Sequence, residues 1–421
     1  MAGTNRFKKD FSFYALGIVV PALLNAALIP IIKNLLGTDV FGAYSLKFNF
    51  LLLLQAILIG GIFQSVIRFK VDAENNLSAF YAQVFLLVKY LLAPVIIICF
   101  LLLLFYFHET FLLSFAFTCC IIGGSFHNIL TAIAQSNFQS TFILISEGVR
   151  AFVFFLFAVG SLYFSKNYQQ ELLLLSLLFS YLVSIFLLAK KNKLSIRKII
   201  GFNKSENTAF NTRQFLMYGF PLSLWFAIYY LFTYADKPLL ANDFGYLVQG
   251  NYQALFDIVF RGITAIMSPF LIAVFPIVTQ AFQQNKKTTA FNLLQQLIAL
   301  QIILAIIGAL IYWYVGFDIM AKILTVPLTH DYKLSGLLMI VACMVWQIGM
   351  LYQNFFKLIK RTDLIIKFML ISLAAFAVYF VFIKTNAQEK MFWYTLPFLI
   401  AGVIYNVLCV GYIYLNKILK T

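Results

Sequence analysis

The sequence predicts an all-α integral membrane protein with about twelve transmembrane helices, arranged as two parallel-repeat six-helix lobes around a central cavity. Composition is the first reason, because 62% of the 421 residues are hydrophobic and only 11% are charged, whereas soluble domains carry roughly 25% charged residues. The second reason is a series of apolar runs that each reach the ~20 residues needed to cross a bilayer. The third is a similar loop that occurs in each half of the chain.

The apolar runs define the expected helices one by one. They are continuous, whereas the strands of a membrane β-barrel alternate in segments of about ten residues. The apolar part of the first run is too long for the 7–15-residue core of a signal peptide, so we expect it to be retained as a helix. The expected spans are 11–33, 43–66, 82–107, 111–135, 141–164, 171–189, 214–234, 248–277, 289–314, 333–356, 363–384 and 391–415.

The longest polar stretch divides the spans into two halves. It covers residues 190–213 and reads KKNKLSIRKIIGFNKSENTAFNTR. We therefore expect an N-terminal lobe over 1–189, a basic cytoplasmic linker over 190–213 and a C-terminal lobe over 214–421. A basic linker suits contact with anionic lipid headgroups; a regulatory or partner-binding role is the alternative.

The repeated loop reads LLGTDVFGAY at residues 35–44 and LLANDFGY at residues 239–246. Aligned on their leucine pairs, the two stretches superpose their aspartates and, after one deletion, the pairs Phe41-Gly42 and Phe244-Gly245. Glycine permits a tight turn with positive φ, so the loops are expected to be turns that aim the following helix. Six spans per half make the repeat parallel, and in such transporters the substrate pathway lies between the halves.

The net charge of +16 is explained by topology. With a cytoplasmic N-terminus, most Lys and Arg residues fall in cytoplasmic segments, as the positive-inside rule requires. Both termini are then cytoplasmic, and the charge needs no nucleic-acid partner. The segments expected outside hold only Lys33, Lys166, Lys237, Lys322, Lys333, Lys384 and Lys390.

Charged residues within the expected spans are the candidate cavity residues. Glu147 and Arg150 lie three apart in span 141–164, and Asp257 and Arg261 lie four apart in span 248–277. Each pair shares a helix face, and a charge inside the bilayer faces the bundle interior or water and is a functional candidate. Lys47 and Lys89 complete the set.

Two interpretations of these charges remain open at this stage. In the first, they line a cationic cavity, where an arginine binds phosphate oxygens in a bidentate manner. In the second, the acid–base pairs only hold helices together, and the lysines reach the headgroups. His127 is either a proton carrier or a hydrogen-bonded packing residue.

Several classes of enzyme are not supported by the sequence. The five cysteines lie in apolar segments without metal-site spacing, and no GxxxxGK[ST] phosphate-binding loop is present. No segment expected outside the membrane is long enough for a catalytic domain, which argues against a membrane-embedded glycosyltransferase or polymerase. We therefore expect a transporter with no catalytic residue, metal or cofactor, and coupling to Na⁺ or H⁺ stays open.

Four further stretches are distinctive: LLGTDVFGAYSL after the first span, GIFQSVIRF with Arg68 as its second-to-last residue, YGFPLSLWFAIYYLFTYADKPLLANDFG around Asp236 and Lys237, and FPIVTQAF. They resemble the polysaccharide branch, with Wzx-type flippases, of the multidrug/oligosaccharidyl-lipid/polysaccharide exporter (MOP) superfamily. Arg68, Asp236 and Lys237 are thus candidates for a gate or cavity rim. Pro21 and Pro221 join them, because a proline inside a helix kinks it.

The resemblance implies a flippase of a bacterial cytoplasmic membrane. Such a protein moves an undecaprenyl-diphosphate-linked oligosaccharide, a repeat unit of O-antigen, capsule or exopolysaccharide, by alternating access between two lobes. Its partners would be the lipid-linked oligosaccharide, membrane lipids, a polymerase and other polysaccharide-assembly proteins. The alternative is a cation-coupled multidrug or small-molecule exporter of the same superfamily, which would use acidic cavity groups such as Glu147 or Asp257.

Overall fold

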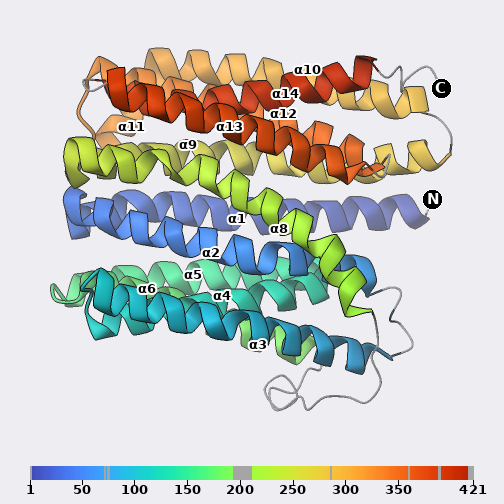
Figure 1. Cartoon of the computed structure of the whole chain (residues 1–421), viewed down its shortest axis with the longest axis horizontal. Coiled ribbons are helices and arrows are strands. Elements are labelled where there is room, and N and C mark those ends of the chain that lie inside the picture. The colour runs from blue at the N-terminus through green and yellow to red at the C-terminus, as the bar shows by residue number, and fades with distance from the viewer. Residues whose placement is uncertain are drawn as a thin grey trace. The chain divides into compact units, whose positions relative to one another are not determined.

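The computed structural model describes residues 2–70, 73, 76–137, 139–192, 211–284, 287–358, 361–386 and 390–415, and within these ranges it contains helices and no strands (Figure 1). The predicted all-α class is confirmed. The helices are α1 Ala2–Leu36, α2 Thr38–Phe69, α3 Leu77–Leu101, η2 Leu102–Tyr106, α4 Phe111–Ser136, α5 Ser140–Phe164, α6 Gln169–Lys191, α8 Thr212–Tyr234, α9 Asp236–Gln283, α10 Lys287–Ile311, η3 Tyr312–Gly316, α11 Phe317–Leu324, α12 His330–Leu358, α13 Thr362–Asn386, η4 Met391–Tyr394 and α14 Leu396–Leu415.

The chain forms two compact units whose boundaries cut through helices. Unit 1 comprises Met1–Leu24 and Lys47–Tyr230, and unit 2 comprises Asn25–Leu46 and Leu231–Thr421. Each of α1, α2 and α8 therefore has one end in unit 1 and the other end in unit 2. Each unit contains segments from both halves of the sequence, and the expected division at 189 and 214 stays a prediction. Residues 193–210 of the expected linker lie outside the described residues.

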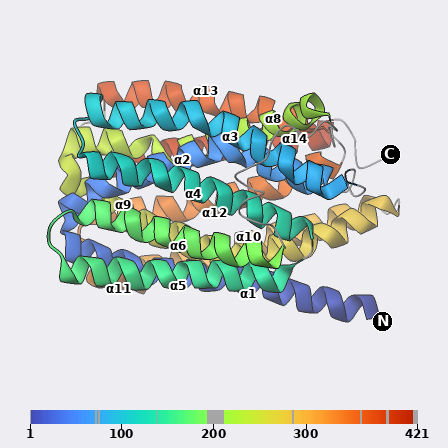
Figure 2. The same cartoon turned by 90° about the horizontal axis from the view of Figure 1, so that it is seen from below.

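Unit 1 is built around α6, which packs against both α4 and α5 (Figures 1 and 2). Helix α8 packs closely on the second half of α2. The backbone nitrogen of Gly61 in α2 donates to the Ser223 hydroxyl in α8 at 2.8 Å. A Cβ on Gly61 would collide with the carbonyl oxygen of Gly219. Glycine at this crossing allows the two helices to approach more closely than any other residue would.

Unit 2 is built around α12, which packs against α9, α10 and α14. Its centre is aromatic: Trp346 stacks on Phe398 and on Tyr405, and its ring contacts Phe232. The Trp346 indole nitrogen donates to the Phe398 carbonyl at 3.0 Å. A buried tryptophan keeps its hydrogen bond in this way while filling the core.

Eleven helical segments are long and apolar enough to cross a membrane, as judged over the described residues. One of them, Thr212–Met267, has 56 residues, about 84 Å of helix, against a hydrocarbon core of about 30 Å. It contains a break at Gly245, where φ is +82° and ψ is 167°. This segment therefore accounts for the two predicted spans 214–234 and 248–277. The chain is a multi-pass membrane protein.

The internal repeat exists, but its register differs from the predicted one. The turn glycines are Gly37, with φ +84°, and Gly245, with φ +82°, whereas Gly42 lies inside α2. The prediction that Gly42 corresponds to Gly245 is therefore wrong. With the turn glycines superposed, residues 37–44 and 245–252 share the pattern Gly-x-x-Val-x-Gly-x-Tyr.

Contacts inside unit 2 support the corrected register. A Cβ on Gly42 would collide with the carbonyl oxygen of Tyr246, and a Cβ on Gly250 would collide with that of Thr38. Thr38 and Tyr246 each follow a turn glycine, so the two close contacts are equivalent under the repeat. Gln249 also donates to the Ser45 hydroxyl at 3.2 Å. The repeat thus joins the start of α2 to α9 through paired glycines.

Candidate functional site

A charged network lies in the middle of unit 1, at Glu147 and Arg150 of α5. The Arg150 guanidinium donates to Glu147 Oε2 from Nη2 at 2.8 Å and from Nε at 3.0 Å. The other carboxylate oxygen, Oε1, lies 2.9 Å from His127 Nε2 of α4. The i,i+3 spacing on α5 places acid and base on one face, so the predicted ion pair is present and has a third member.

Helix α6 completes this network. Ser184 lies 3.1 Å from His127 Nδ1, and the Tyr181 ring lies 5.7 Å from the Arg150 guanidinium and 5.6 Å from the imidazole. If His127 donates from Nε2 to Glu147, a neutral imidazole can accept a hydrogen bond from the Ser184 hydroxyl at Nδ1. Tautomers of this kind are assigned from the hydrogen-bond network and not observed directly.

The network is buried at one end and accessible at the other. The His127 side chain is 4% exposed, whereas those of Glu147 and Arg150 are each 19% exposed. A carboxylate held between an imidazole and a guanidinium has a compensated charge, and its contacts are charge-assisted hydrogen bonds. The role of proton carrier that the sequence left open for His127 stays a prediction.

A polar stripe runs along α9 in unit 2. Gln249, Gln253, Asp257 and Arg261 follow one another at intervals of four, which places neighbouring members on the same helix face. Gln253 is 1% exposed, and neither atom of its amide has a hydrogen-bond partner within the described part of the chain. Arg261 Nε is likewise buried without a partner there.

The structure contradicts the expectation that Asp257 and Arg261 of this stripe form an ion pair. Among the described residues, Asp257 and Arg261 form no ion pair with each other, so the view of a self-neutralised pair is wrong for α9. Buried polar groups are almost always hydrogen-bonded to protein or water, and an unpaired charge within a membrane span faces the interior or water. The buried amide of Gln253 and the Nε of Arg261 are therefore free to bind water or a ligand along α9.

The two candidate lysines of unit 1 differ in their surroundings. Lys47 Nζ forms an ion pair with Glu109 at 2.6 Å and donates to Gln170 at 3.0 Å. Glu109 lies two residues before α4 and Gln170 lies in the first turn of α6, so the Lys47 ammonium group lies near the starts of these two helices. Lys89 of α3 is exposed and has no partner among residues that the structure describes. A substrate role for either stays a prediction.

Asp236 and Lys237 lie in the core of unit 2 and not on an exposed rim. Their side chains, 5% and 0% exposed, form an ion pair at 3.2 Å. The Tyr252 hydroxyl donates to Asp236 at 2.6 Å, and Lys237 also donates to the Thr233 carbonyl. The ammonium group lies 3.8 Å from the centre of the Phe256 ring. The pair is fully satisfied, and a part in gating stays a prediction.

The remaining rim candidates lie in unit 1 and share no cluster. Arg68 is exposed near the end of α2, with its guanidinium 5.8 Å from the Phe69 ring. Pro21 is buried in α1, three residues before the unit boundary at Leu24, and Pro221 lies inside α8. Each proline removes one helical hydrogen bond, so both remain candidates for bending points.

Lys33 is a buried residue whose environment the sequence did not reveal. It was assigned to an outside segment, but it is 1% exposed at the end of α1. Its ammonium group donates to Asn251 at 2.6 Å and to the carbonyls of Leu324 and Thr325. Thr325 has a φ of +52°, unusual for a β-branched residue. Lys33 thereby caps the C-terminal end of α11. The only signal for this in the sequence is that Lys33 lies at the end of the apolar run 11–33.

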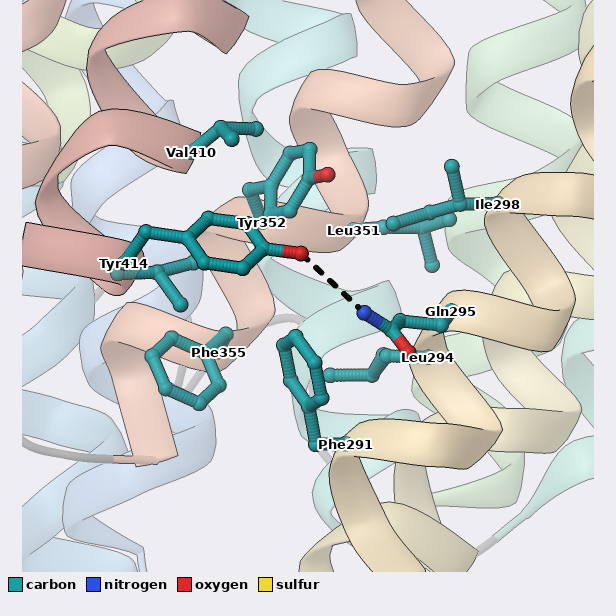
Figure 3. A pocket seen from close by; sticks show the side chains of 10 residues that line it. Phe291, Leu294, Gln295, Ile298, Leu351, Tyr352, Phe355, Val410 and Tyr414 are labelled. Carbon is teal, nitrogen blue, oxygen red and sulfur yellow. Dashed lines mark hydrogen bonds between the residues drawn. The ribbon is translucent and has the colours of Figure 1, made fainter. Parts of the chain in front are cut away.

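An apolar crevice lies between α10, α12 and α14 of unit 2 (Figure 3). Figure 3 shows the Gln295 amide pointing to the Tyr414 hydroxyl, at 3.5 Å, with Tyr352 above it. The free space is only about 20 Å³, about the volume that one water needs. This crevice does not accommodate a drug-sized ligand in the present conformation. The described residues also hold no group of His, Cys, Asp and Glu suited to a metal ion.

Comparison by sequence finds no relative: no protein-family model matches the chain, and no curated protein matches it. Comparison by structure finds solved transporters that match over their whole length. A MATE protein in complex with MaL6 has a TM-score of 0.72 at 12% identity, covering 99% of this chain and 98% of its own. An outward-facing multidrug resistance MATE family transporter of the MOP superfamily has a TM-score of 0.71 at 12% identity, covering 99% and 97%. The chain has the MATE fold.

A third solved MATE-fold protein is described as a MOP superfamily transporter from Pyrococcus furiosus with reversed polarity of its binding pocket. It has a TM-score of 0.71 at 13% identity and covers 99% of this chain and 96% of its own. Identities this low establish the fold alone. The neighbours are transporters, and the multidrug resistance transporter among them fits the exporter alternative better than a polysaccharide flippase.

Proposed function

We propose that this MATE-fold protein is a cation-coupled exporter of small molecules that works by alternating access. The observation that carries the proposal is the network of Glu147, Arg150 and His127, a carboxylate with compensated charge inside the membrane-spanning part of unit 1. Structural likeness to multidrug transporters along the whole chain supports it. The unsatisfied stripe on α9 supplies polar groups for a hydrated path.

Coupling requires one group whose charge changes during the cycle. Glu147 suits this role because His127 and Arg150 bind its two oxygens separately. Binding of H⁺ or Na⁺ at Glu147 Oε1 would compete with the imidazole hydrogen bond, while Arg150 continues to hold Oε2. Cation binding would thereby loosen α4 from α5, and because it neutralises the carboxylate it would also reduce the charge compensation of Arg150, which favours a rearrangement of the network.

The test is efflux in proteoliposomes loaded with a fluorescent cationic dye, with a pH or Na⁺ gradient imposed. We expect gradient-driven efflux for the native chain and a loss of at least tenfold for Glu147→Gln, because the amide cannot bind the coupling ion. The matched control Glu109→Gln removes a carboxylate near the helix ends and should retain efflux. Gradient-independent efflux, or full activity of Glu147→Gln, would refute the coupling site.

The second candidate is the lipid-linked oligosaccharide flippase that the sequence motifs suggest. The observation in its favour is Arg261, whose guanidinium has no ion pair with any acid that the structure describes and could bind a diphosphate. Two other cations are less available than expected, because Arg150 is paired with Glu147 and Lys47 with Glu109. Fewer free cations weaken this candidate relative to the exporter.

One assay separates the two functions. The same proteoliposomes, containing a fluorescent undecaprenyl-diphosphate oligosaccharide, report translocation when an added glycosidase reaches the sugar. An exporter leaves the lipid in its original leaflet and moves the dye. A flippase translocates the lipid, and Arg261→Gln should then slow it at least tenfold while Arg361→Gln, an exposed arginine, has no effect.

A further inference from the structure

A basic hollow lies at the corner where α11 leads into α12 in unit 2. It has a volume of about 380 Å³ and is lined by Lys322, His330, Lys333, Asp318, Phe317, Leu328 and Thr329. The lining residues come from two helices and the short connection between them. It is separate from the α5 network and from the α9 stripe, and none of its polar residues has a role in the proposed transport cycle.

The cations of this hollow have no anionic partner. Among the described residues, Lys322 forms no hydrogen bond or ion pair, and Lys333 contacts only the Trp313 ring, with Nζ 4.8 Å from its centre. The nearby acid Asp331 is turned away and accepts a hydrogen bond from the Met391 backbone at 3.0 Å. Asp318 is thus the one acid in the lining, against two lysines and a histidine.

The margin of the hollow is apolar and exposed. Ile319 and Ile323 of α11 are 52% and 53% exposed, and Leu328 is 61% exposed. The opposite face of α11 is buried through Phe317 and Leu324. A short helix with one apolar face outside and charged residues beside it is typical of a segment at the boundary between headgroups and acyl chains. Exposed apolar side chains therefore border the basic hollow.

We propose that this hollow binds the phosphate headgroup of an anionic phospholipid. Lys322 and Lys333 bind the phosphate oxygens, and the acyl chains lie along Ile319, Ile323 and Leu328. The apolar margin distinguishes a lipid from a free phosphate ion, which would gain nothing from it. Trp313 holds the Lys333 ammonium beside the hollow by a cation–π contact, so the site is formed before the lipid arrives.

The experiment is a titration of the purified, delipidated full chain with short-chain phosphatidylglycerol, followed by native mass spectrometry. Each lysine beside a headgroup is expected to contribute about fivefold in affinity. The double variant Lys322→Gln/Lys333→Gln should therefore bind about 25-fold more weakly, whereas Lys322→Arg/Lys333→Arg should bind nearly as well as the native chain. The matched control is Lys166→Gln, which removes an exposed lysine next to the exposed Tyr163 and Phe164.

Two results would overturn the proposal. The first is an unchanged affinity in the double glutamine variant, which would place lipid binding elsewhere. The second is displacement of the lipid by excess inorganic phosphate, which would make the hollow a free-anion site. Thermal unfolding of each variant shows whether it is folded, and if the double glutamine variant does not fold, the single variants Lys322→Gln and Lys333→Gln decide the test, each with an expected loss of about fivefold in affinity. Neither result depends on transport activity, so failure here is distinct from failure of the exporter function.

Discussion

At the scale of single residues, the buried charges of this protein differ in how completely they are satisfied. Lys33 and Lys237 lie in the interior with several acceptors each, whereas Arg261 has a buried nitrogen without any described partner. A satisfied buried charge stabilises one packing arrangement, while an unsatisfied one demands water or a ligand. Satisfaction therefore marks Lys33 and Lys237 as structural charges and Arg261 as a candidate for contact with water or a ligand.

The Asp236–Lys237 pair allows a direct test at this scale. Asp236→Leu leaves a lysine that is 0% exposed without its counter-charge, and we expect a loss of about 3–5 kcal/mol in the free energy of unfolding. The double variant Asp236→Leu/Lys237→Met removes both charges and should recover most of that loss. Thermal unfolding in detergent measures both. Equal destabilisation by the single and the double variant would show that the pair's charges do not interact.

At the scale of helices, glycines decide where two elements can approach. Gly42 and Gly250 join α2 to α9 in unit 2, and Gly61 and Gly219 join α2 to α8 in unit 1. Each contact places one helix backbone against another, so that even a methyl group collides with a carbonyl oxygen. Helix α2 thus approaches a helix of the second sequence half through paired glycines twice. It contacts α9 in unit 2 and α8 in unit 1.

Two glycines of the same helix provide a matched comparison. A Cβ on Gly250 meets the Thr38 backbone, whereas a Cβ on Gly262 meets nothing within 4 Å. Gly250→Ala should therefore cost about 1–3 kcal/mol through overpacking, and Gly262→Ala should be neutral or stabilise by up to about 1 kcal/mol. Thermal unfolding of both variants is the measurement. Similar effects at both positions would mean that the α2–α9 contact is not tight.

At the scale of the whole molecule, α1, α2 and α8 each belong to both compact units. The end of α1, which comes from the first sequence half, is held in unit 2 by Lys33 through Asn251 and Thr325. Alternating access requires helices of the two sequence halves to separate at one membrane face and then at the other. For the exporter proposed above, we predict that the contact between the end of α1 and the end of α11, both in unit 2, opens in this way.

A reversible cross-link tests whether this contact opens during transport. Thr325 donates to Asn34 at 3.3 Å, and both residues are exposed, so Asn34→Cys/Thr325→Cys should form a disulfide on oxidation. We expect oxidation to reduce dye efflux at least tenfold and reduction to restore it. The single variant Asn34→Cys controls for oxidation of native cysteines, of which four are buried and Cys119 is partly so. Full efflux by the cross-linked chain would show that the contact stays closed.

The sequence alone was sufficient for the class of protein and for features that depend on neighbours along the chain. Apolar runs predicted the helices, and a turn was expected at Gly245, where φ is positive. The spacing of three residues predicted the pairing of Glu147 with Arg150, which the structure contains. Each of these is local, because helix geometry and hydrophobic length are set by residues a few positions apart.

Tertiary structure alone decided the partners that come from distant helices. The positive φ angles of Gly37 and Gly245 identify the equivalent turn positions of the two repeats. Alignment on the aspartates and the Phe-Gly pairs of the sequence produces a different and incorrect register. Asp257 and Arg261 stay apart although their spacing allows a pair, and His127 joins Glu147 across 20 positions. Lys33 and Lys237 are buried because other helices cover them. The burial of a side chain and the number of its hydrogen-bond partners depend on which helices pack together. Local hydropathy does not determine which helices these are.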